Sequence, residues 1–118
     1  MQIIGIGIDL IRLSRITDEV ARRGANAFAR KILSKKESEM FSLTEDQLGF
    51  LQSRFAVKEA LFKATSAFKR LKWSEVSLLK DNQGKPFVEF LEEPELSAQV
   101  SISHDGGVLV AMAMVFKQ

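Results

Sequence analysis

Residues 54–64 have the sequence Arg-Phe-Ala-Val-Lys-Glu-Ala-Leu-Phe-Lys-Ala, and they lie inside a longer segment with helical periodicity. The apolar side chains that recur on one face of this segment are Leu48, Leu51, Phe55 and Phe62. Because an apolar stripe of this kind packs into a core, we expect a long helix over residues 44–67.

Glu59 falls on the apolar face of this helix, between Phe55 and Phe62. An unpaired buried carboxylate is costly, so we expect it to be protonated, ion-paired or bound to a metal ion. Lys58 precedes it and Lys63 follows one turn later, and two ammonium groups beside a carboxylate suit a site for a metal and a phosphate. The alternative is an ordinary Glu59–Lys63 helix pair, which contributes only about 0.3 kcal/mol.

Residues 2–9 alternate between isoleucine and other residues, which predicts a strand with its isoleucine face in the core. The opposite face carries Gly5 and Gly7, where another element can approach the backbone closely, and Asp9 ends that face. A third glycine and a Gly-Lys-Ser/Thr sequence are both missing, so the segment is neither a dinucleotide-binding nor a P-loop motif.

The remaining pattern predicts an α+β fold, in which an N-terminal strand and helices pack on an antiparallel sheet. We expect a helix over residues 10–23 that stops at Gly24, a packed connection near residue 30, and a short helix capped by Ser34 and Glu37. Two antiparallel strand pairs follow, over residues 75–80 and 86–91 and over residues 98–104 and 108–116. The last strand is apolar on both faces, which indicates either a central position or a subunit interface.

Length and composition favour one domain over residues 1–118, with 46% hydrophobic residues to form a modest core. The chain has no cysteine and one histidine, which excludes disulfides, thiolate metal sites and multi-histidine zinc sites. We expect no signal peptide, because Met1 leads directly into the isoleucine-rich run, and that run is too short to span a bilayer. A cytoplasmic location is therefore the expectation.

Charge is unevenly distributed although the net charge is only +2. Residues 12–36 contain eight basic side chains and two acidic ones, whereas residues 37–53 contain four acidic side chains and no basic one. Such segregation indicates either a basic surface for an acidic partner or a solvated helix face.

Three motifs in one order together resemble a known family. They are Gly5-Ile6-Gly7-Ile8-Asp9 followed by Arg15, the stretch 54–64, and Ser101-Ile102-Ser103-His104 before the last strand. This ordered set resembles the 4′-phosphopantetheinyl transferase superfamily, in particular its short, trimeric holo-[acyl-carrier-protein] synthase type, and it covers nearly the whole chain. The resemblance implies transfer of 4′-phosphopantetheine from coenzyme A to a serine of apo acyl carrier protein, with release of adenosine 3′,5′-bisphosphate, in support of fatty acid biosynthesis.

The resemblance also implies roles for individual residues. Asp9 and Glu59 match the family's Mg²⁺ ligands, and Mg²⁺ favours one or two carboxylates together with phosphate oxygens and water. Lys63 matches the lysine at the phosphates, and Glu59 or a metal-bound water would activate the serine. Further matching positions contact coenzyme A, and they are Arg54, Lys58 and His104, with His104 near the 3′-phosphate.

Partner surfaces follow from the same resemblance. Arg15 matches an arginine that binds the acidic carrier protein, and Arg22 and Arg23 are expected to assist. A homotrimer with active sites between subunits is implied, and the doubly apolar last strand suits such an interface. We expect neither nucleic acid nor a membrane as partner.

One departure concerns Thr65-Ser66-Ala67-Phe68, which stands where the family usually has a Gly-Thr-Gly turn at the nucleotide. The contacts to coenzyme A there are in question, whereas the metal site is not. Two other functions compete with transfer. One is an RNA-binding module built on the basic segment, which leaves Asp9 and Glu59 unexplained, and the other is a carrier-protein binder that has lost catalysis.

Overall fold

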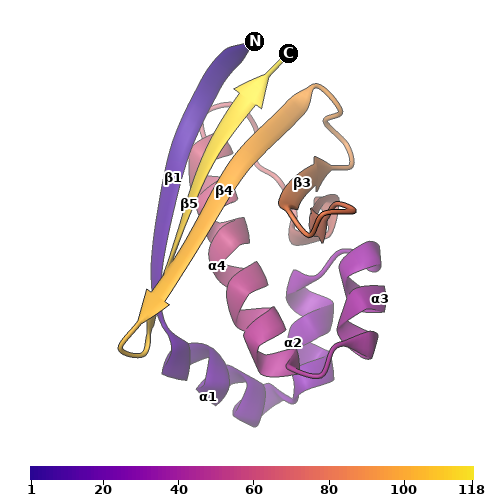
Figure 1. Cartoon of the computed structure of the whole chain (residues 1–118), viewed down its shortest axis with the longest axis vertical. Helices are drawn as coiled ribbons and strands as arrows, with labels where there is room; N and C mark the ends of the chain where they lie inside the picture. The colour runs from indigo at the N-terminus through magenta and orange to yellow at the C-terminus, as the bar shows by residue number, and fades with distance from the viewer.

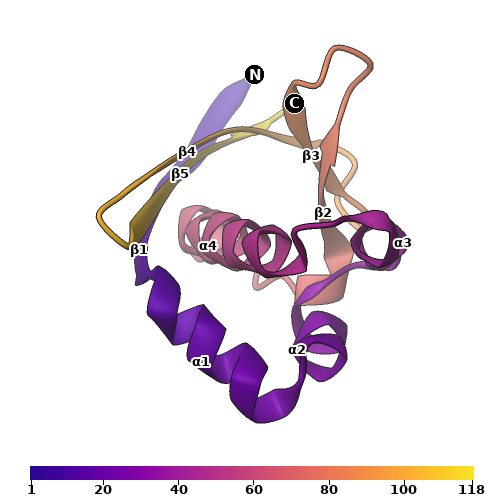
Figure 2. The ribbon, with the colours of Figure 1, turned by 60° about the horizontal axis from the view of Figure 1, so that its bottom comes forward.

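Helix α4 (Gln47–Thr65) lies in the middle of the molecule, and the other elements surround it (Figures 1 and 2). The computed structural model describes all 118 residues. The Asp46 side chain caps α4 by accepting a hydrogen bond of 2.9 Å from the Gly49 amide. The helix therefore begins later than residue 44, because Thr44 instead ends the preceding helix. The helix predicted around the stretch 54–64 is confirmed.

A three-stranded antiparallel sheet covers one side of α4, with the strand order β1-β5-β4. Its strands are β1 (Gln2–Arg12), β4 (Leu96–Asp105) and β5 (Val108–Lys117). The connection between β4 and β5 places Gly106 and Gly107 at φ 57° and φ 81°, which glycine adopts without strain. The doubly apolar strand β5 is the central strand, which confirms one of the two positions predicted for it.

Strand β1 turns its glycine face, and not its isoleucine face, toward α4. A Cβ atom at Gly5 would lie 1.8 Å from the Ala64 carbonyl oxygen, and one at Gly7 would lie 1.9 Å from the Ala60 carbonyl oxygen. The helix can approach only over residues without side chains, so the isoleucines point outward, and Ile6 and Ile8 are 62% and 60% exposed. The prediction that the isoleucine face lies in the core is therefore wrong for the single subunit.

Three helices connect β1 to α4, and they are α1 (Leu13–Arg23), α2 (Ala25–Ile32) and α3 (Lys35–Leu43). Strand β1 continues through Arg12, paired to Val108 of β5, so the helix expected from residue 10 begins at Leu13. The connection expected near residue 30 is helix α2. Gly24, at φ 89°, separates α1 from α2. The predicted capping box at Ser34 and Glu37 is confirmed.

On the other side of α4 the chain forms a short 3-10 helix η1 (Trp73–Glu75) and the predicted hairpin. The hairpin strands are β2 (Val76–Lys80) and β3 (Pro86–Phe90), which form a separate two-stranded sheet. Figure 2 shows α4 enclosed between this hairpin and the larger sheet. No helix combines the length and the apolar character that crossing a membrane requires.

Candidate functional site

Asp9 and Lys63 meet where the inner face of β1 contacts α4. The Lys63 ammonium donates hydrogen bonds to Asp9 Oδ1 at 3.1 Å and to the Ile8 carbonyl at 2.9 Å. Asp9 is 9% exposed because Gly5 and Gly7 bring its strand close to the helix. Its second oxygen, Oδ2, is buried and has no hydrogen-bond partner. A buried carboxylate oxygen without a donor is an open coordination position for a cation.

Glu59 lies one turn before Lys63 on α4, half-buried and without an ion-pair partner. Burial raises the pKa of the Glu59 carboxyl, and the Asp9 carboxylate raises it further, whereas Lys63 and Arg15 act in the opposite direction. The two carboxylates are therefore close enough to repel each other. Lys63 pairs with Asp9 and not with Glu59, so the ordinary helix pair considered as an alternative is not present.

This pair of carboxylates fits a magnesium ion. The Asp9 carboxylate influences the Glu59 carboxyl electrostatically, Asp9 Oδ2 is buried without a hydrogen-bond partner, and Glu59 has no ion-pair partner. No group of three or more metal-ligating side chains exists in the chain. Substrate phosphate oxygens and water would complete the coordination, which is the arrangement that Mg²⁺ favours over an all-protein cage.

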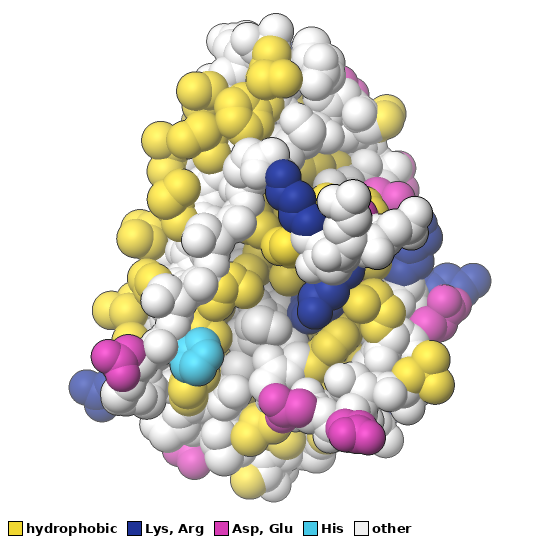
Figure 3. Space-filling view, viewed as in Figure 1, with side chains coloured by type: hydrophobic (Ala, Val, Ile, Leu, Met, Phe, Trp, Pro, Cys, Tyr) yellow, Lys and Arg dark blue, Asp and Glu magenta, His cyan; other side chains and the backbone are white.

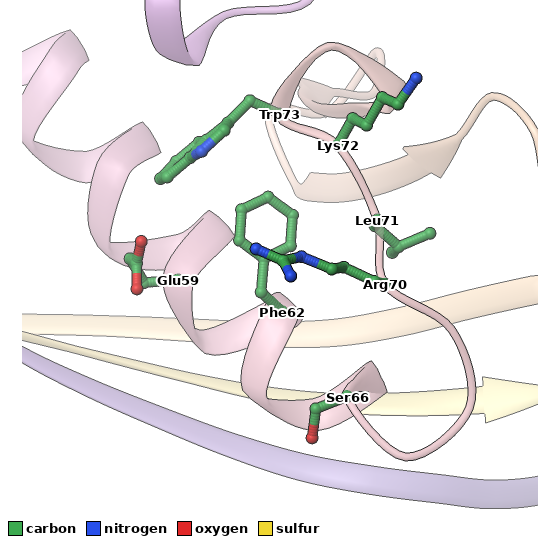
Figure 4. A pocket seen from close by; sticks show the side chains of 7 residues that line it. All are labelled: Glu59, Phe62, Ser66, Arg70, Leu71, Lys72 and Trp73. Atoms are coloured by element: carbon green, nitrogen blue, oxygen red, sulfur yellow. The ribbon is translucent and has the colours of Figure 1, made fainter.

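A cavity of about 560 Å³ opens beside Glu59, between α4 and the segment that follows it (Figure 4). Its lining residues are Glu59, Phe62, Ser66, Arg70, Leu71, Lys72 and Trp73. The rings of Trp73 and Phe62 meet edge to face at 4.8 Å and form an apolar wall. Arg70 and Lys72 have no carboxylate within ion-pair distance, so the cavity offers an apolar wall, a carboxylate and two free cations.

All the hydrogen-bond and ion-pair partners of Lys58 belong to the protein itself. Its ammonium group is wholly buried, where it pairs with Glu37 and donates to the Ile32 and Trp73 carbonyls at 2.8 and 2.9 Å. No part of the side chain reaches the surface, so it cannot touch coenzyme A in this conformation. This burial could not be predicted from the sequence, because the partner Glu37 is remote in the chain. We do not retain Lys58 as a coenzyme A contact.

Arg54 and His104 line two different cavities of the subunit. Arg54 donates to the Leu78 carbonyl at 3.0 Å, stacks 3.8 Å from the Phe50 ring centroid, and borders a cavity of about 390 Å³. His104 is exposed at the end of β4 and borders a cavity of about 300 Å³ that also contacts Gln52. One subunit therefore does not bring these two expected ligand contacts together.

Helix α1 carries the three arginines expected to bind a carrier protein. Arg15 is exposed and lies 5.2 Å from the Phe55 ring centroid, on the side of α4 that carries Glu59. Arg22 and Arg23 occupy the last turn and both pair with Glu19, at 2.7 and 2.9 Å. These contacts lower the pKa of Glu19 and offset part of the positive charge of that turn.

The segment Thr65-Ser66-Ala67-Phe68 closes the end of α4. The helix stops at Thr65, whose carbonyl accepts hydrogen bonds from the Phe68 and Lys69 amides at 2.9 Å. The Lys117 ammonium lies over the Phe68 ring, 4.9 Å from its centroid, and Lys69 forms an ion pair with Glu93. The chain that follows this turn supplies three of the residues that line the cavity, namely Arg70, Lys72 and Trp73. These three residues could not be predicted from the sequence, because the helical period ends there and a loop carries no periodic signal.

Comparisons with known proteins identify the family of this chain. Residues 5–113 match the family described as the 4′-phosphopantetheinyl transferase superfamily. The holo-[acyl-carrier-protein] synthase of Chlorobaculum tepidum is 40% identical over 113 residues, which cover 92% of this chain and 95% of that protein. The enzyme of the same name from Vibrio vulnificus is 36% identical and covers 88% of this chain and 84% of its own.

Solved structures give the same result. A holo-(acyl-carrier-protein) synthase from Bacillus anthracis, in complex with CoA (3′,5′-ADP), superposes with a TM-score of 0.82 at 29% identity and covers all of both chains. The holo-[acyl-carrier-protein] synthase from Neisseria meningitidis also reaches a TM-score of 0.82, at 27% identity, and covers 98% of this chain and 100% of its own.

Proposed function

This chain belongs to the 4′-phosphopantetheinyl transferase superfamily, in its holo-[acyl-carrier-protein] synthase branch, and from that premise we propose which of its residues carry the reaction. It transfers 4′-phosphopantetheine from coenzyme A to a serine hydroxyl of apo acyl carrier protein, which gives holo acyl carrier protein and adenosine 3′,5′-bisphosphate. A role in fatty acid biosynthesis is consistent with this activity. We place the reaction in the cytoplasm as part of the proposal.

Asp9 and Glu59 are the proposed Mg²⁺ ligands. The observation that carries this assignment is the orphaned Asp9 Oδ2 beside the unpaired Glu59 carboxylate. When bound, the ion would offset the charge of the coenzyme A diphosphate and of the leaving phosphate. Glu59 is also the proposed general base, because a carboxylate at this position would be able to accept the proton of the carrier serine.

Lys63 is proposed to stabilise the departing phosphate. Its ammonium has three N–H groups, of which one binds Asp9 and another the Ile8 carbonyl, so one donor remains free. The two fixed hydrogen bonds orient the free one before substrate arrives. A pre-oriented donor stabilises developing negative charge without a cost of reorganisation.

Coenzyme A is proposed to contact Arg54 and His104 as well. Each borders a surface cavity, but the two cavities of one subunit are separate. Active sites formed between neighbouring subunits would allow Arg54 of one copy and His104 of the next to bind the same coenzyme A molecule.

A homotrimer is proposed to form through the outer face of the large sheet. Ile6, Ile8 and Leu10 alternate on that face of β1 and are 60–67% exposed. In the antiparallel pairing of β1 with β5, they lie opposite Met114, Met112 and Val110 of β5. Figure 3 shows hydrophobic side chains gathered along the edge of the molecule where β1 runs. An apolar surface of this extent on a single subunit indicates a protein interface.

Ile8→Lys is expected to disrupt this assembly, because it places an ammonium group on the apolar face. The molar mass measured by light scattering after size exclusion should fall from three subunits to one, with activity lost at the same time. Leu91→Lys is the matched control, since Leu91 is also exposed, at 46%, but follows β3 of the two-stranded sheet and is not part of β1. An unchanged mass for Ile8→Lys would contradict the proposed interface.

Arg15→Glu is expected to lower kcat/KM for the acidic carrier protein about 10-fold at low salt, because charge pairs across an interface chiefly raise the association rate. The wild-type rate should approach that of the variant as salt screens the pairing. Steady-state kinetics with varied carrier and varied coenzyme A separate the two substrates, and the KM for coenzyme A should stay unchanged. Arg30→Glu, an equal charge change on α2, should have little effect, and equal losses in both variants would argue against docking on α1.

One experiment tests the proposed function as a whole. The protein is incubated with apo acyl carrier protein, coenzyme A and Mg²⁺, and the carrier is weighed by mass spectrometry. We expect a gain of the size of phosphopantetheine that EDTA abolishes and added Mg²⁺ restores. A folded protein that binds the carrier without modifying it would indicate a binder that has lost catalysis.

A further inference from the structure

Glu37, in the first turn of α3, is a wholly buried carboxylate that joins three elements. It accepts hydrogen bonds from the Ser34 amide of its own capping box and from the Leu78 amide of β2, both at 3.0 Å. It also pairs with the Lys58 ammonium of α4, and the Arg54 Nε lies 3.7 Å away. The site described above does not use this carboxylate.

Lys58 is held in one position by this carboxylate and by two carbonyl groups. Its three N–H donors match its three acceptors, which are Glu37 and the carbonyls of Ile32 and Trp73. Burial lowers the pKa of Lys58, and the Glu37 carboxylate opposes that shift. A fully satisfied polar group of this kind fixes the relative positions of the segments that it joins.

Trp73 connects this buried pair to the cavity. Its carbonyl is bound by Lys58, while its ring stacks on Phe55 at 5.5 Å and meets Phe62 edge to face at 4.8 Å. The ring faces the cavity across from Glu59, as Figure 4 shows. Lys58 directly precedes Glu59 on α4. The same helical turn therefore carries the Glu59 carboxylate on one side of the cavity and the Lys58 ammonium that binds Trp73 on the other.

We propose that Lys58, supported by Glu37, is a positioning residue that sets the distance between the Trp73 wall and Glu59, and thereby the placement of the pantetheine arm of coenzyme A in this cavity. The proposal rests on the proposed function for the identity of the arm. The apolar wall suits the methylene and thiol part of such an arm, and Arg70 and Lys72 suit its phosphate end. Lys58 would act entirely through Trp73, without touching the substrate.

The double variant Glu37→Gln/Lys58→Met tests this inference. Removing both members of the Glu37–Lys58 pair is less destabilising than removing one of them, although Arg54, whose Nε lies 3.7 Å from Glu37, loses its neighbouring carboxylate. Trp73 is the only tryptophan in the chain, so its fluorescence reports the wall directly. We expect a shifted emission maximum, weaker quenching by coenzyme A, and a KM for coenzyme A raised about 10-fold, because small misplacements in a site have large kinetic effects.

The single variant Glu37→Gln is the matched control. Lys58 loses its counter-ion there, so the melting temperature should fall. It keeps its bonds to both carbonyls, so below the melting temperature the Trp73 emission and the KM for coenzyme A should change much less than in the double variant. A merely structural role would lower the melting temperature and leave the emission and the KM unchanged below it, and that result for the folded double variant would overturn the proposal.

A second variant and a second readout keep the test decisive. Should the double variant not fold, Lys58→Arg retains the charge pair but cannot reproduce three donors diverging from one nitrogen, and it should shift the Trp73 emission in the same way. An unshifted emission in folded Lys58→Arg would overturn the proposal. The emission without coenzyme A does not depend on turnover, so failure of this inference is distinct from failure of the proposed function, which would appear as an inactive wild-type protein.

Discussion

Glu59→Gln is expected to reduce kcat/KM for phosphopantetheine transfer at least about 100-fold and at the same time to raise the melting temperature. A neutral amide is a much weaker Mg²⁺ ligand than a carboxylate, and even groups behind the ligands of a metal site typically contribute a factor of 10 to 100. Isothermal titration with MgCl₂ alone should show weakened binding. This readout does not depend on turnover.

The gain in stability follows from the direction of the Glu59 pKa. Burial, with the help of Asp9, raises that pKa above its value in the unfolded chain, so the folded state binds the proton more tightly. The favourable contribution is complete below the unfolded pKa and is lost as the pH rises through the folded pKa. At neutral pH the ionised side chain therefore lowers stability, and glutamine removes this penalty.

Scanning calorimetry at neutral pH, without metal, measures this effect. Glu39→Gln is the matched control, because Glu39 is an exposed carboxylate on α3 and its removal should change neither activity nor melting temperature appreciably. The gain of Glu59→Gln should shrink as the pH is lowered, since the wild-type carboxyl then becomes neutral as well. A variant that turns over normally, or one that melts below the wild type at neutral pH, would contradict the assignment of Glu59.

Gly7→Ala is expected to destabilise the fold by at least about 3 kcal/mol, or to prevent folding, because overpacking at a rigid contact costs this much or more. The new Cβ would lie 1.9 Å from the Ala60 carbonyl oxygen and 2.9 Å from the Ala64 amide nitrogen. Both are backbone atoms of α4, so no side chain can rotate away and the helix itself would have to move. That movement would also separate Asp9 from Glu59.

Urea denaturation followed by circular dichroism measures this loss. Gly107→Ala is the matched control, because Gly107 has φ 81° but a Cβ there meets no atom within 4 Å. Its cost should be confined to the backbone, at about 1 kcal/mol. Equal losses for the two variants would show that the close approach of α4 to β1 is not the reason for the glycine at position 7.

The sequence was sufficient to predict the long helix, the two antiparallel strand pairs and the candidate residues Asp9, Glu59 and Lys63. Helical and strand periodicities are local properties, so they survive in the sequence. The orientation of β1 was not predictable in the same way. Alternation defines two faces of a strand but not which of them another element covers, and here the glycine face allows the closest approach to α4.

Lys58 shows a second limit of sequence analysis. Its position beside Glu59 suggested a phosphate contact, but its direction depends on Glu37 and on the carbonyls of Ile32 and Trp73, all of which are remote in the chain. The cavity residues Arg70 and Trp73 were missed for a related reason. Irregular segments are placed by tertiary contacts, and those contacts leave no period in the sequence.

If the exposed isoleucine face of β1 is a subunit interface, as proposed, the active form of the protein depends on the protein concentration. If subunits meet through that face, as proposed, their folding and their association cannot be separated, and the measured stability rises with protein concentration. Activity per subunit would then decline on dilution, before any subunit unfolds. The amount of protein present would thus set both how much of it is assembled and how much of it is active.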